Sequence, residues 1–158
     1  MRKIFAQFLL NKMQDNKNIL LLTGDLGYGL FDEIRASFPD QCYNFGSSEL
    51  TMVTAACGMA KENKIPYVYS ITPFILFRPF EAIRNYIDHE RTPVKLIGGG
   101  RNKEYGYLGF SHWGEDDMKF MNNFENILSY KPNDDYELKK TLEYSLNINL
   151  GVYINLKK

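Results

Sequence analysis

Glu49 is the residue whose type and position most suggest chemistry. It follows Gly46-Ser47-Ser48 and lies at the start of residues 48–63, whose apolar spacing and small side chains predict a helix. In the simpler interpretation, Glu49 is a first-turn carboxylate that interacts with the helix dipole beside a serine cap. The small side chains would also allow this helix to lie close to the sheet or to a second subunit. A carboxyl group enclosed there would be desolvated and able to hydrogen-bond a heterocycle nitrogen.

His112 is the second candidate. It ends the string Gly109-Phe110-Ser111-His112, where an imidazole could move a proton near neutral pH or donate to a developing alkoxide. A structural histidine is the alternative. The run Gly98-Gly99-Gly100-Arg101 permits close backbone approach and offers a cation to a phosphate, although a mobile surface loop is the simpler interpretation.

The elements that must position these residues alternate along the chain. Short apolar runs predict strands, and apolar residues at helical spacing predict helices between them. The predicted strands are 19–22, 41–45, 67–71, 94–97, 126–130 and 152–156, and the predicted helices are 2–15, 31–38, 48–63, 79–90, 116–122 and 134–146, the last with Asp134 as cap. This alternation predicts an α/β fold of three α/β/α layers with a six-stranded, mainly parallel sheet. Ligands of such sheets bind beyond the carboxyl ends of the strands, where all three candidate segments fall.

Composition limits the possible function classes. The 158 residues suffice for one compact domain and are too few for two. Lys plus Arg and Asp plus Glu number 19 each, so no net charge recruits nucleic acid or a membrane surface. No apolar run resembles a membrane span or a signal peptide, and we expect a cytoplasmic protein. Cys42 and Cys57 are expected to be reduced core residues, with a disulfide as the alternative.

Several segments, in order, resemble the transketolase family. The string FGSSELTMVTAACGMAKENKIPYVYSI is similar to the family segment in which a Gly, a Glu and a Met precede a small-residue helix and a Lys-x-Pro turn into a strand. The other segments resemble, in chain order, the first strand, a later helix and strand, the substrate loop and the closing strand of the pyrimidine-binding domain. They are LLLTGDLGYGLFDEIRASFPDQCYNFG, FRPFEAIRNYIDHERTPVKLIGGG, YGYLGFSHWGEDDMKFM and GVYINLKK. The chain is thus identified as a single pyrimidine-binding domain over residues 1–158.

The resemblance implies a cofactor, thiamine diphosphate, and a role for Glu49. In that family, its counterpart hydrogen-bonds N1′ of the aminopyrimidine and favours the 4′-imino tautomer, which then takes a proton from the cofactor. Aromatic residues after the third strand cradle the pyrimidine ring, and Phe74 and Phe77 are the candidates here, with core packing as the alternative. Asp25 either braces its Gly-rich turn or lies near the cofactor.

The same resemblance implies which residues contact the substrate. His112 is implied to point at a sugar-phosphate substrate, and Ser111 and Arg101 are further candidates for substrate contacts. An acidic residue that reads a substrate hydroxyl in transketolase proper is replaced here by Leu108, four positions before the histidine. The sugar specificity of ordinary transketolase is therefore not expected.

A second departure concerns the diphosphate. The family holds it through a divalent metal in a Gly-Asp-Gly motif with a later Asn, and no Gly-Asp-Gly occurs in this sequence. We therefore expect Mg²⁺ or Ca²⁺ and the diphosphate to be bound by a partner chain, and the family's carboxy-terminal domain to be absent. The cofactor would lie between the two chains. The implied assembly is a homodimer core, built on the helix at residues 48–63, within a heterotetramer.

The expected function is transfer of a two-carbon ketol unit between phosphorylated or activated sugars, active only with the diphosphate-domain partner. One alternative keeps the cofactor and changes the reaction to decarboxylation or carboligation of a 2-keto acid. Another is a non-catalytic orphan domain that serves assembly or regulation.

Overall fold

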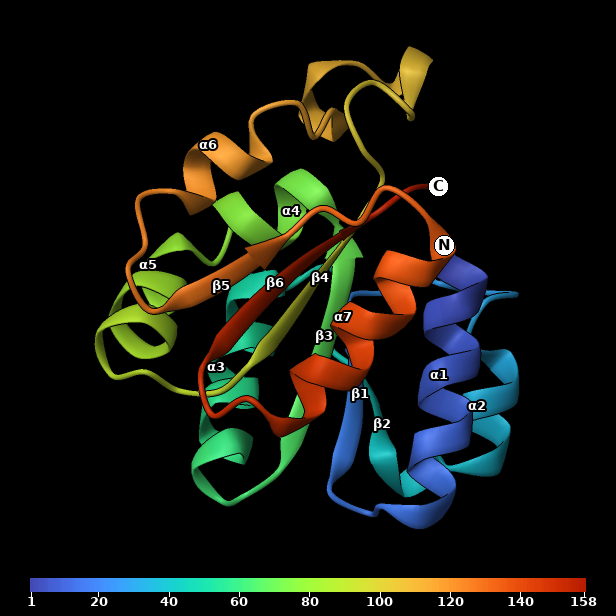
Figure 1. The fold of residues 1–158 in the computed structure, drawn as a ribbon. Coiled ribbons are helices and arrows are strands. Elements are labelled where there is room, and N and C mark those ends of the chain that lie inside the picture. The colour runs from blue at the N-terminus through green and yellow to red at the C-terminus, as the bar shows by residue number, and fades with distance from the viewer.

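The computed structural model describes residues 1–158 and has a six-stranded sheet at its centre (Figure 1). The strand order is β2-β1-β3-β4-β6-β5, and every neighbouring pair is parallel. The strands are β1 (Ile19–Thr23), β2 (Cys42–Asn44), β3 (Ile65–Ile71), β4 (Lys95–Gly99), β5 (Ile127–Tyr130) and β6 (Gly151–Leu156). All six predicted strands are confirmed, and the sheet is entirely parallel.

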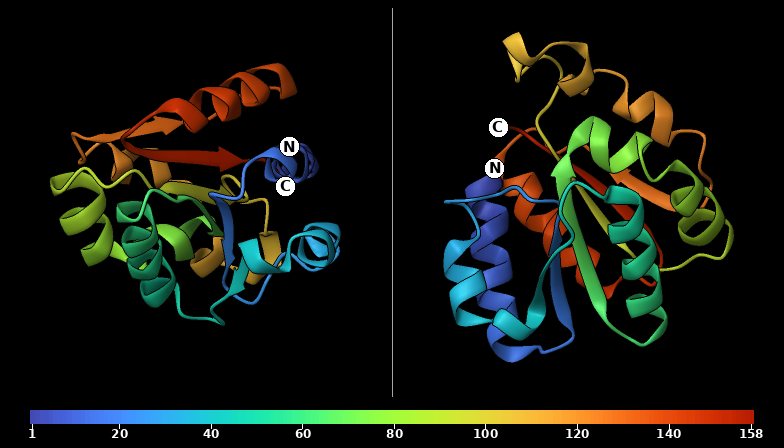
Figure 2. Two further views of the ribbon diagram at one scale, coloured as in Figure 1. Left: turned by 90° about the horizontal axis from the view of Figure 1, so that it is seen from below. Right: turned by 180° about the vertical axis from the view of Figure 1, so that it is seen from behind.

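Helices cover both faces of this sheet (Figure 2). They are α1 (Arg2–Asp15), α2 (Asp32–Ser37), α3 (Glu49–Lys61), α4 (Thr72–Phe77), α5 (Phe80–Ala82), α6 (Asp117–Met121) and α7 (Asp135–Asn147). Apolar residues of α1, α2 and α7 form one core layer with the sheet, and those of α3, α4, α5 and α6 form the other. The three-layer α/β/α class is thereby confirmed.

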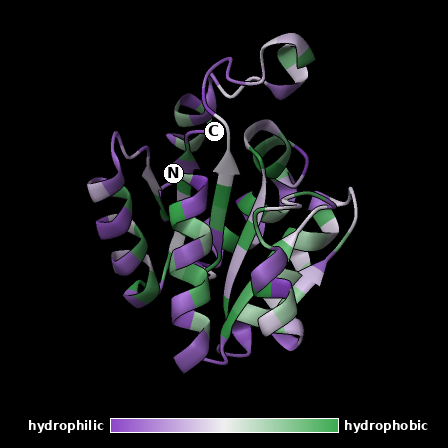
Figure 3. Ribbon diagram, turned by 90° about the vertical axis from the view of Figure 1, so that its right-hand side faces the viewer, coloured by the Kyte–Doolittle hydropathy of each residue, from purple (hydrophilic) through white to green (hydrophobic).

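Burial explains the strand composition. Every residue of β1, β4 and β6 is buried, because helices cover both faces of these strands. The edge strand β2 is short and half-buried to exposed. The hydropathy colouring shows the same arrangement, with green strands inside and purple outer faces on the helices (Figure 3). No helix combines the length and the apolar character needed to cross a bilayer.

Two helical segments differ from the prediction. Residues 72–77 form α4, where no helix was predicted; Pro73 lies in its first turn, where the missing amide removes no helical hydrogen bond. The helix predicted at 79–90 is instead α5 followed by a π-helical stretch, Ile83–His89.

Helix α7 begins as predicted, with the Asp134 side chain accepting from the Glu137 amide at 2.8 Å. Both cysteines are free, Cys57 buried and Cys42 half-buried.

Candidate functional site

Glu49 is buried at the carboxyl edge of the sheet. It is the first residue of α3, and only 2% of its surface is exposed. Oε1 accepts a hydrogen bond of 2.9 Å from Ser70 Oγ, at the end of β3. Gly24 lies beside it, and a Cβ there would stand 3.4 Å from Oε1. The serine cap expected for α3 is absent, because Ser48 Oγ bonds Thr51 instead.

Arg78 completes the surroundings of Glu49. Its Nη1 donates to Glu49 Oε2 at 2.7 Å, and the guanidinium carbon lies 3.8 Å from the centroid of the Phe74 ring. Phe74 also contacts the His112 ring, edge to face, with centroids 4.9 Å apart. Successive contacts therefore connect the Glu49 carboxyl group, the Arg78 guanidinium, the Phe74 ring and the His112 imidazole.

His112 and Ser111 lie on the segment between β4 and α6. The His112 ring is half-buried between Phe74 and Tyr105, and Ser111 Oγ lies 3.0 Å from Nδ1. Ser111 itself is exposed, as is Leu108, four residues upstream. The structure thus connects His112 to Glu49 through Phe74 and Arg78, and His112 and Glu49 are the two side chains predicted to be catalytic.

The structure separates the two aromatic candidates. Phe74 lies against Arg78 and His112, whereas the Phe77 ring stacks edge to face on Phe120 of α6 at 4.9 Å. Phe77 therefore joins a second aromatic cluster with Phe80 and Phe120. Of the two rings, only that of Phe74 contacts the guanidinium of Arg78, the ion-pair partner of Glu49.

Asp25 braces the turn after β1. Its amide donates to Asn44 Oδ1 at 2.8 Å, and its carboxylate accepts from the Tyr28 hydroxyl. The Tyr28 and Asn44 hydrogen bonds lower the pKa of this exposed carboxyl group. Asp25 has a φ of 54°, which Asp tolerates better than most residues. These contacts match the bracing interpretation; a role near the cofactor stays a prediction.

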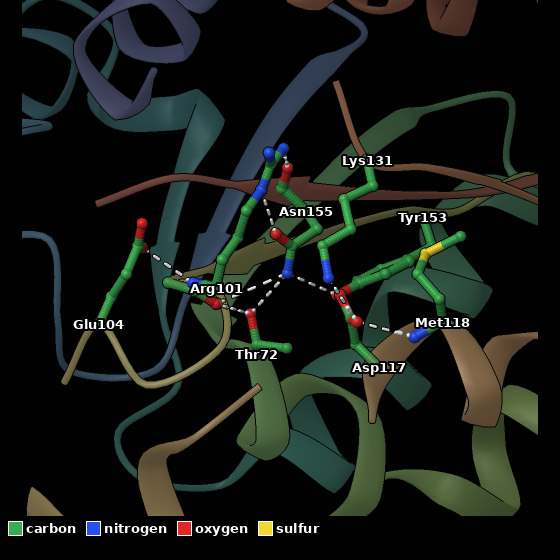
Figure 4. A network of polar contacts seen from close by, with 9 residues as sticks. Thr72, Arg101, Glu104, Asp117, Met118, Lys131, Tyr153 and Asn155 are labelled. Atoms are coloured by element: carbon green, nitrogen blue, oxygen red, sulfur yellow. Dashed lines mark hydrogen bonds and ion pairs between the residues drawn. The ribbon is translucent and has the colours of Figure 1, made fainter. Parts of the chain in front are cut away.

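Arg101 is placed differently from its prediction. Only 4% of it is exposed, and its Nε and Nη2 donate to Oδ1 and O of Asn155 in β6, both at 2.6 Å. Figure 4 shows this guanidinium beside Asn155 of β6, within a network of polar contacts. The prediction that Arg101 offers an exposed cation to a substrate phosphate is therefore not supported, because Asn155 holds the guanidinium in the protein interior.

The same network holds both ends of the segment that carries His112 (Figure 4). At its start, Asn155 links Arg101 to Tyr153, whose hydroxyl lies 3.1 Å from Asn155 Nδ2. At its end, buried Asp117 accepts from Tyr153 OH at 3.0 Å and from Lys131 Nζ at 3.2 Å. Burial and the nearby Asp117 carboxylate raise the pKa of Tyr153 well above its ordinary value, so its hydroxyl is a fixed donor.

Comparison with known proteins decides the family. A family model described as "Transketolase, pyrimidine binding domain" matches residues 1–158. This chain belongs to the transketolase pyrimidine-binding domain family. An apulose-4-phosphate transketolase subunit of Actinobacillus succinogenes is 32% identical over 119 residues, 75% of this chain and 38% of that protein. A 1-deoxy-D-xylulose-5-phosphate synthase of Dehalococcoides mccartyi is 31% identical over 147 residues, 92% of this chain and 22% of that protein.

Solved structures of transketolases share the fold. One described as "Split gene transketolase, inactive beta4 tetramer" has a TM-score of 0.85 and 26% identity, and it covers 99% of this chain and 50% of that one. The chain thus spans half or less of the length of these relatives. The resemblance to the transketolase family is confirmed.

The residues present fit the pyrimidine half of thiamine diphosphate. Glu49 supplies a buried acceptor for a ring nitrogen, and Phe74 supplies a face for stacking. No group of three or more His, Cys, Asp or Glu side chains is arranged to hold a metal ion.

Sequence reasoning missed Ser70 and Arg78. Ser70 is a polar residue in an otherwise apolar strand, and Arg78 interrupts a run of aromatic and apolar residues. Those interruptions were the available signals, because a polar group placed among buried residues requires a partner.

Proposed function

We propose that this chain is the pyrimidine-domain subunit of a two-chain, transketolase-like enzyme. Its reaction is transfer of a two-carbon ketol unit between phosphorylated or activated sugars with thiamine diphosphate. The observation that carries the proposal is the burial of the Glu49 carboxylate at the carboxyl edge of a parallel sheet, where contacts through Arg78 and Phe74 connect it to His112. Had Glu49 faced solvent, this assignment would have no basis.

Glu49 is the proposed catalytic carboxylate. The cofactor, when bound, supplies the carbon nucleophile and the electron sink. Glu49 would accept a hydrogen bond from a ring nitrogen and so hold a proton at that atom. Ser70 Oγ, fully buried and 2.9 Å from Oε1, fixes the orientation of the carboxylate. Phe74 would hold the ring plane, so that the proton stays aligned with the carboxylate oxygen.

His112 is proposed to act on the substrate. The Phe74 ring contacts its imidazole edge to face, and a hydrogen bond donated by Ser111 Oγ to Nδ1 would leave the ring proton on Nε2. Ser111 is a further candidate for a substrate contact. Arg101 is the weakest of the proposed substrate contacts because Asn155 already binds its guanidinium.

A partner chain is proposed to supply the diphosphate site and its Mg²⁺ or Ca²⁺. Two relatives support this division of labour: the protein named as one subunit of an apulose-4-phosphate transketolase, and the structure described as an inactive tetramer of a split-gene transketolase. We propose a homodimer core within a heterotetramer, in the cytoplasm, with no activity for the chain alone.

The test combines this chain with a diphosphate-domain partner and measures thiamine-dependent ketol transfer. We expect Glu49→Ala to lower turnover by roughly 10²- to 10⁴-fold, as for other proton-handling residues. Glu62→Ala is the matched control, since Glu62 is exposed just after the same helix. Full activity of Glu49→Ala would refute the assigned role.

The second candidate is decarboxylation or carboligation of a 2-keto acid on the same cofactor. The 31% identity to a 1-deoxy-D-xylulose-5-phosphate synthase over 92% of this chain supports this second candidate. Carbon dioxide release, measured beside ketol transfer on the same preparation, separates the two. A complex that binds no thiamine diphosphate would favour a non-catalytic assembly role.

A further inference from the structure

The guanidinium of Arg78 makes two contacts at the candidate cofactor site. Nη1 donates to Glu49 Oε2 at 2.7 Å, and the guanidinium carbon lies 3.8 Å from the Phe74 ring centroid. The Glu49 end of this ion pair is buried, whereas 45% of the Arg78 side chain is exposed.

These are the two contacts that an aminopyrimidine would require. A guanidinium is planar, carries N–H donors on an N–C–N edge and stacks on aromatic faces. An aminopyrimidine shares the flat shape and the N–C–N edge, so it would use the same carboxylate oxygen and the same ring face. Two flat groups cannot occupy the face of Phe74 that Arg78 covers at 3.8 Å.

The hydrogen bonds of Glu49 show which contact gives way. Ser70 occupies Oε1 and is fully buried in the end of β3, so it has nowhere to move. Arg78 occupies Oε2 and has an open route to solvent along its exposed side. Displacement of Arg78 would therefore free Oε2 for an incoming N–H without disturbing the Ser70 hydrogen bond.

We propose that Arg78 is an internal occupant of the pyrimidine site, a guanidinium that takes the place of the cofactor ring and moves aside when the cofactor binds. This inference rests on the proposed function. Arg78 compensates the buried Glu49 carboxylate in the unloaded chain, because a buried charge without a partner is strongly destabilising. A cofactor ring protonated at the nitrogen that faces Glu49 would take over that compensation.

The occupant lowers the apparent affinity for the cofactor. Because binding requires the open arrangement, the apparent dissociation constant equals the intrinsic one divided by the open fraction. We expect Arg78→Ala to bind 4-amino-2-methylpyrimidine about tenfold more tightly than the unaltered chain, as measured by calorimetry. Arg84→Ala is the control, since it removes the same charge from an exposed position nearby and should change nothing.

A second readout does not depend on the cofactor. In Arg78→Ala, millimolar methylguanidinium should refill the site and raise the melting temperature of the free chain. It should leave the unaltered chain and Arg84→Ala unchanged. Arg78→Gln, which keeps an N–H donor and most of the side-chain length, serves if the alanine variant does not fold. For either Arg78 variant, binding of the pyrimidine no tighter than that of the unaltered chain would overturn the inference. For Arg78→Ala, the absence of a rise with methylguanidinium would overturn it as well.

Failure of this inference is distinguishable from failure of the proposed function. If the unaltered two-chain complex binds thiamine diphosphate but the Arg78 variant binds it no more tightly, Arg78 is a permanent partner of Glu49 and the function stands. If no complex binds thiamine diphosphate, the function fails, and the methylguanidinium result still decides whether Arg78 occupies a replaceable site.

Discussion

The Asp117 carboxylate should be among the most sensitive positions for stability. It is 1% exposed, and it accepts from the Tyr153 hydroxyl, the Lys131 ammonium and the Met118 amide. In Asp117→Ala, the fully buried Tyr153 hydroxyl loses its acceptor, which costs about 1–3 kcal/mol. The Met118 amide, at the start of α6, also loses its acceptor, which adds about 1 kcal/mol. The Lys131 side chain is 30% exposed, so its ion pair adds less than about 1 kcal/mol.

Together these losses predict a decrease of about 2–5 kcal/mol in the free energy of unfolding, against a typical total of about 5–15 kcal/mol. Urea denaturation followed by circular dichroism measures it, and the melting temperature should fall by about 10 °C. Asp117→Asn retains one acceptor oxygen and should lose about half as much. The neighbouring exposed Asp116 makes no side-chain hydrogen bond, so Asp116→Ala is the control. If the two alanine variants lose equal stability, the reasoning from the buried network is wrong.

Three further predictions concern single groups. Burial lowers the pKa of Lys95 from 10.5 to about 8. Below about pH 8 the side chain is charged in both states, and the full cost of burying that charge lowers the free energy of unfolding. Between about pH 8 and 10.5 Lys95 is neutral in the folded state but still protonated in the unfolded state. The free energy of unfolding should therefore rise with pH in that window, by up to about 3 kcal/mol, relative to Lys95→Met; parallel urea profiles for the two proteins would contradict this. Burial raises the pKa of Cys42 to about 11 and of Cys57 to about 12, so iodoacetamide at pH 7.5 should label neither quickly until urea is added, and rapid labelling of the native chain would disprove it. In the two-chain complex, His112→Ala should lower turnover by roughly 10²- to 10⁴-fold at an unchanged melting temperature; an equal effect of Tyr107→Ala would argue against a specific role.

The sequence predicts the sheet well because its strands have unambiguous patterns. Residues 19–22 form a continuous apolar run, and residues 152–156 are apolar except for Asn155, as burial on both faces of a parallel sheet favours. Helix α4 was missed because Phe74-Ile75-Leu76-Phe77 has no polar face to give a helical period. Pro73, at the start of that helix, was the available signal.

The site was predicted in part. Glu49 stood out because a carboxylate precedes a small-residue helix, and its burial confirms the position that this pattern indicated. Arg101 was misplaced because Asn155, although a polar interruption of an apolar strand, gives no local indication that its partner is a guanidinium 54 positions away. Arg78 gave no local indication of its partner, since its ion pair with Glu49 spans 29 positions of sequence.

The network around Asn155 has a mechanical consequence for the segment above it. Arg101 and Asp117, at its two ends, hydrogen-bond Asn155 and Tyr153 of β6. An antiparallel bridge between Asn102 and Gly114 joins its two strands of chain just above these contacts. Contacts at both ends and across the base therefore constrain where the segment that carries His112 can lie relative to the sheet. Farthest from these contacts are Tyr107, 96% exposed, and Phe110, 79% exposed, so the constrained segment presents two aromatic rings to solvent close to His112 in sequence.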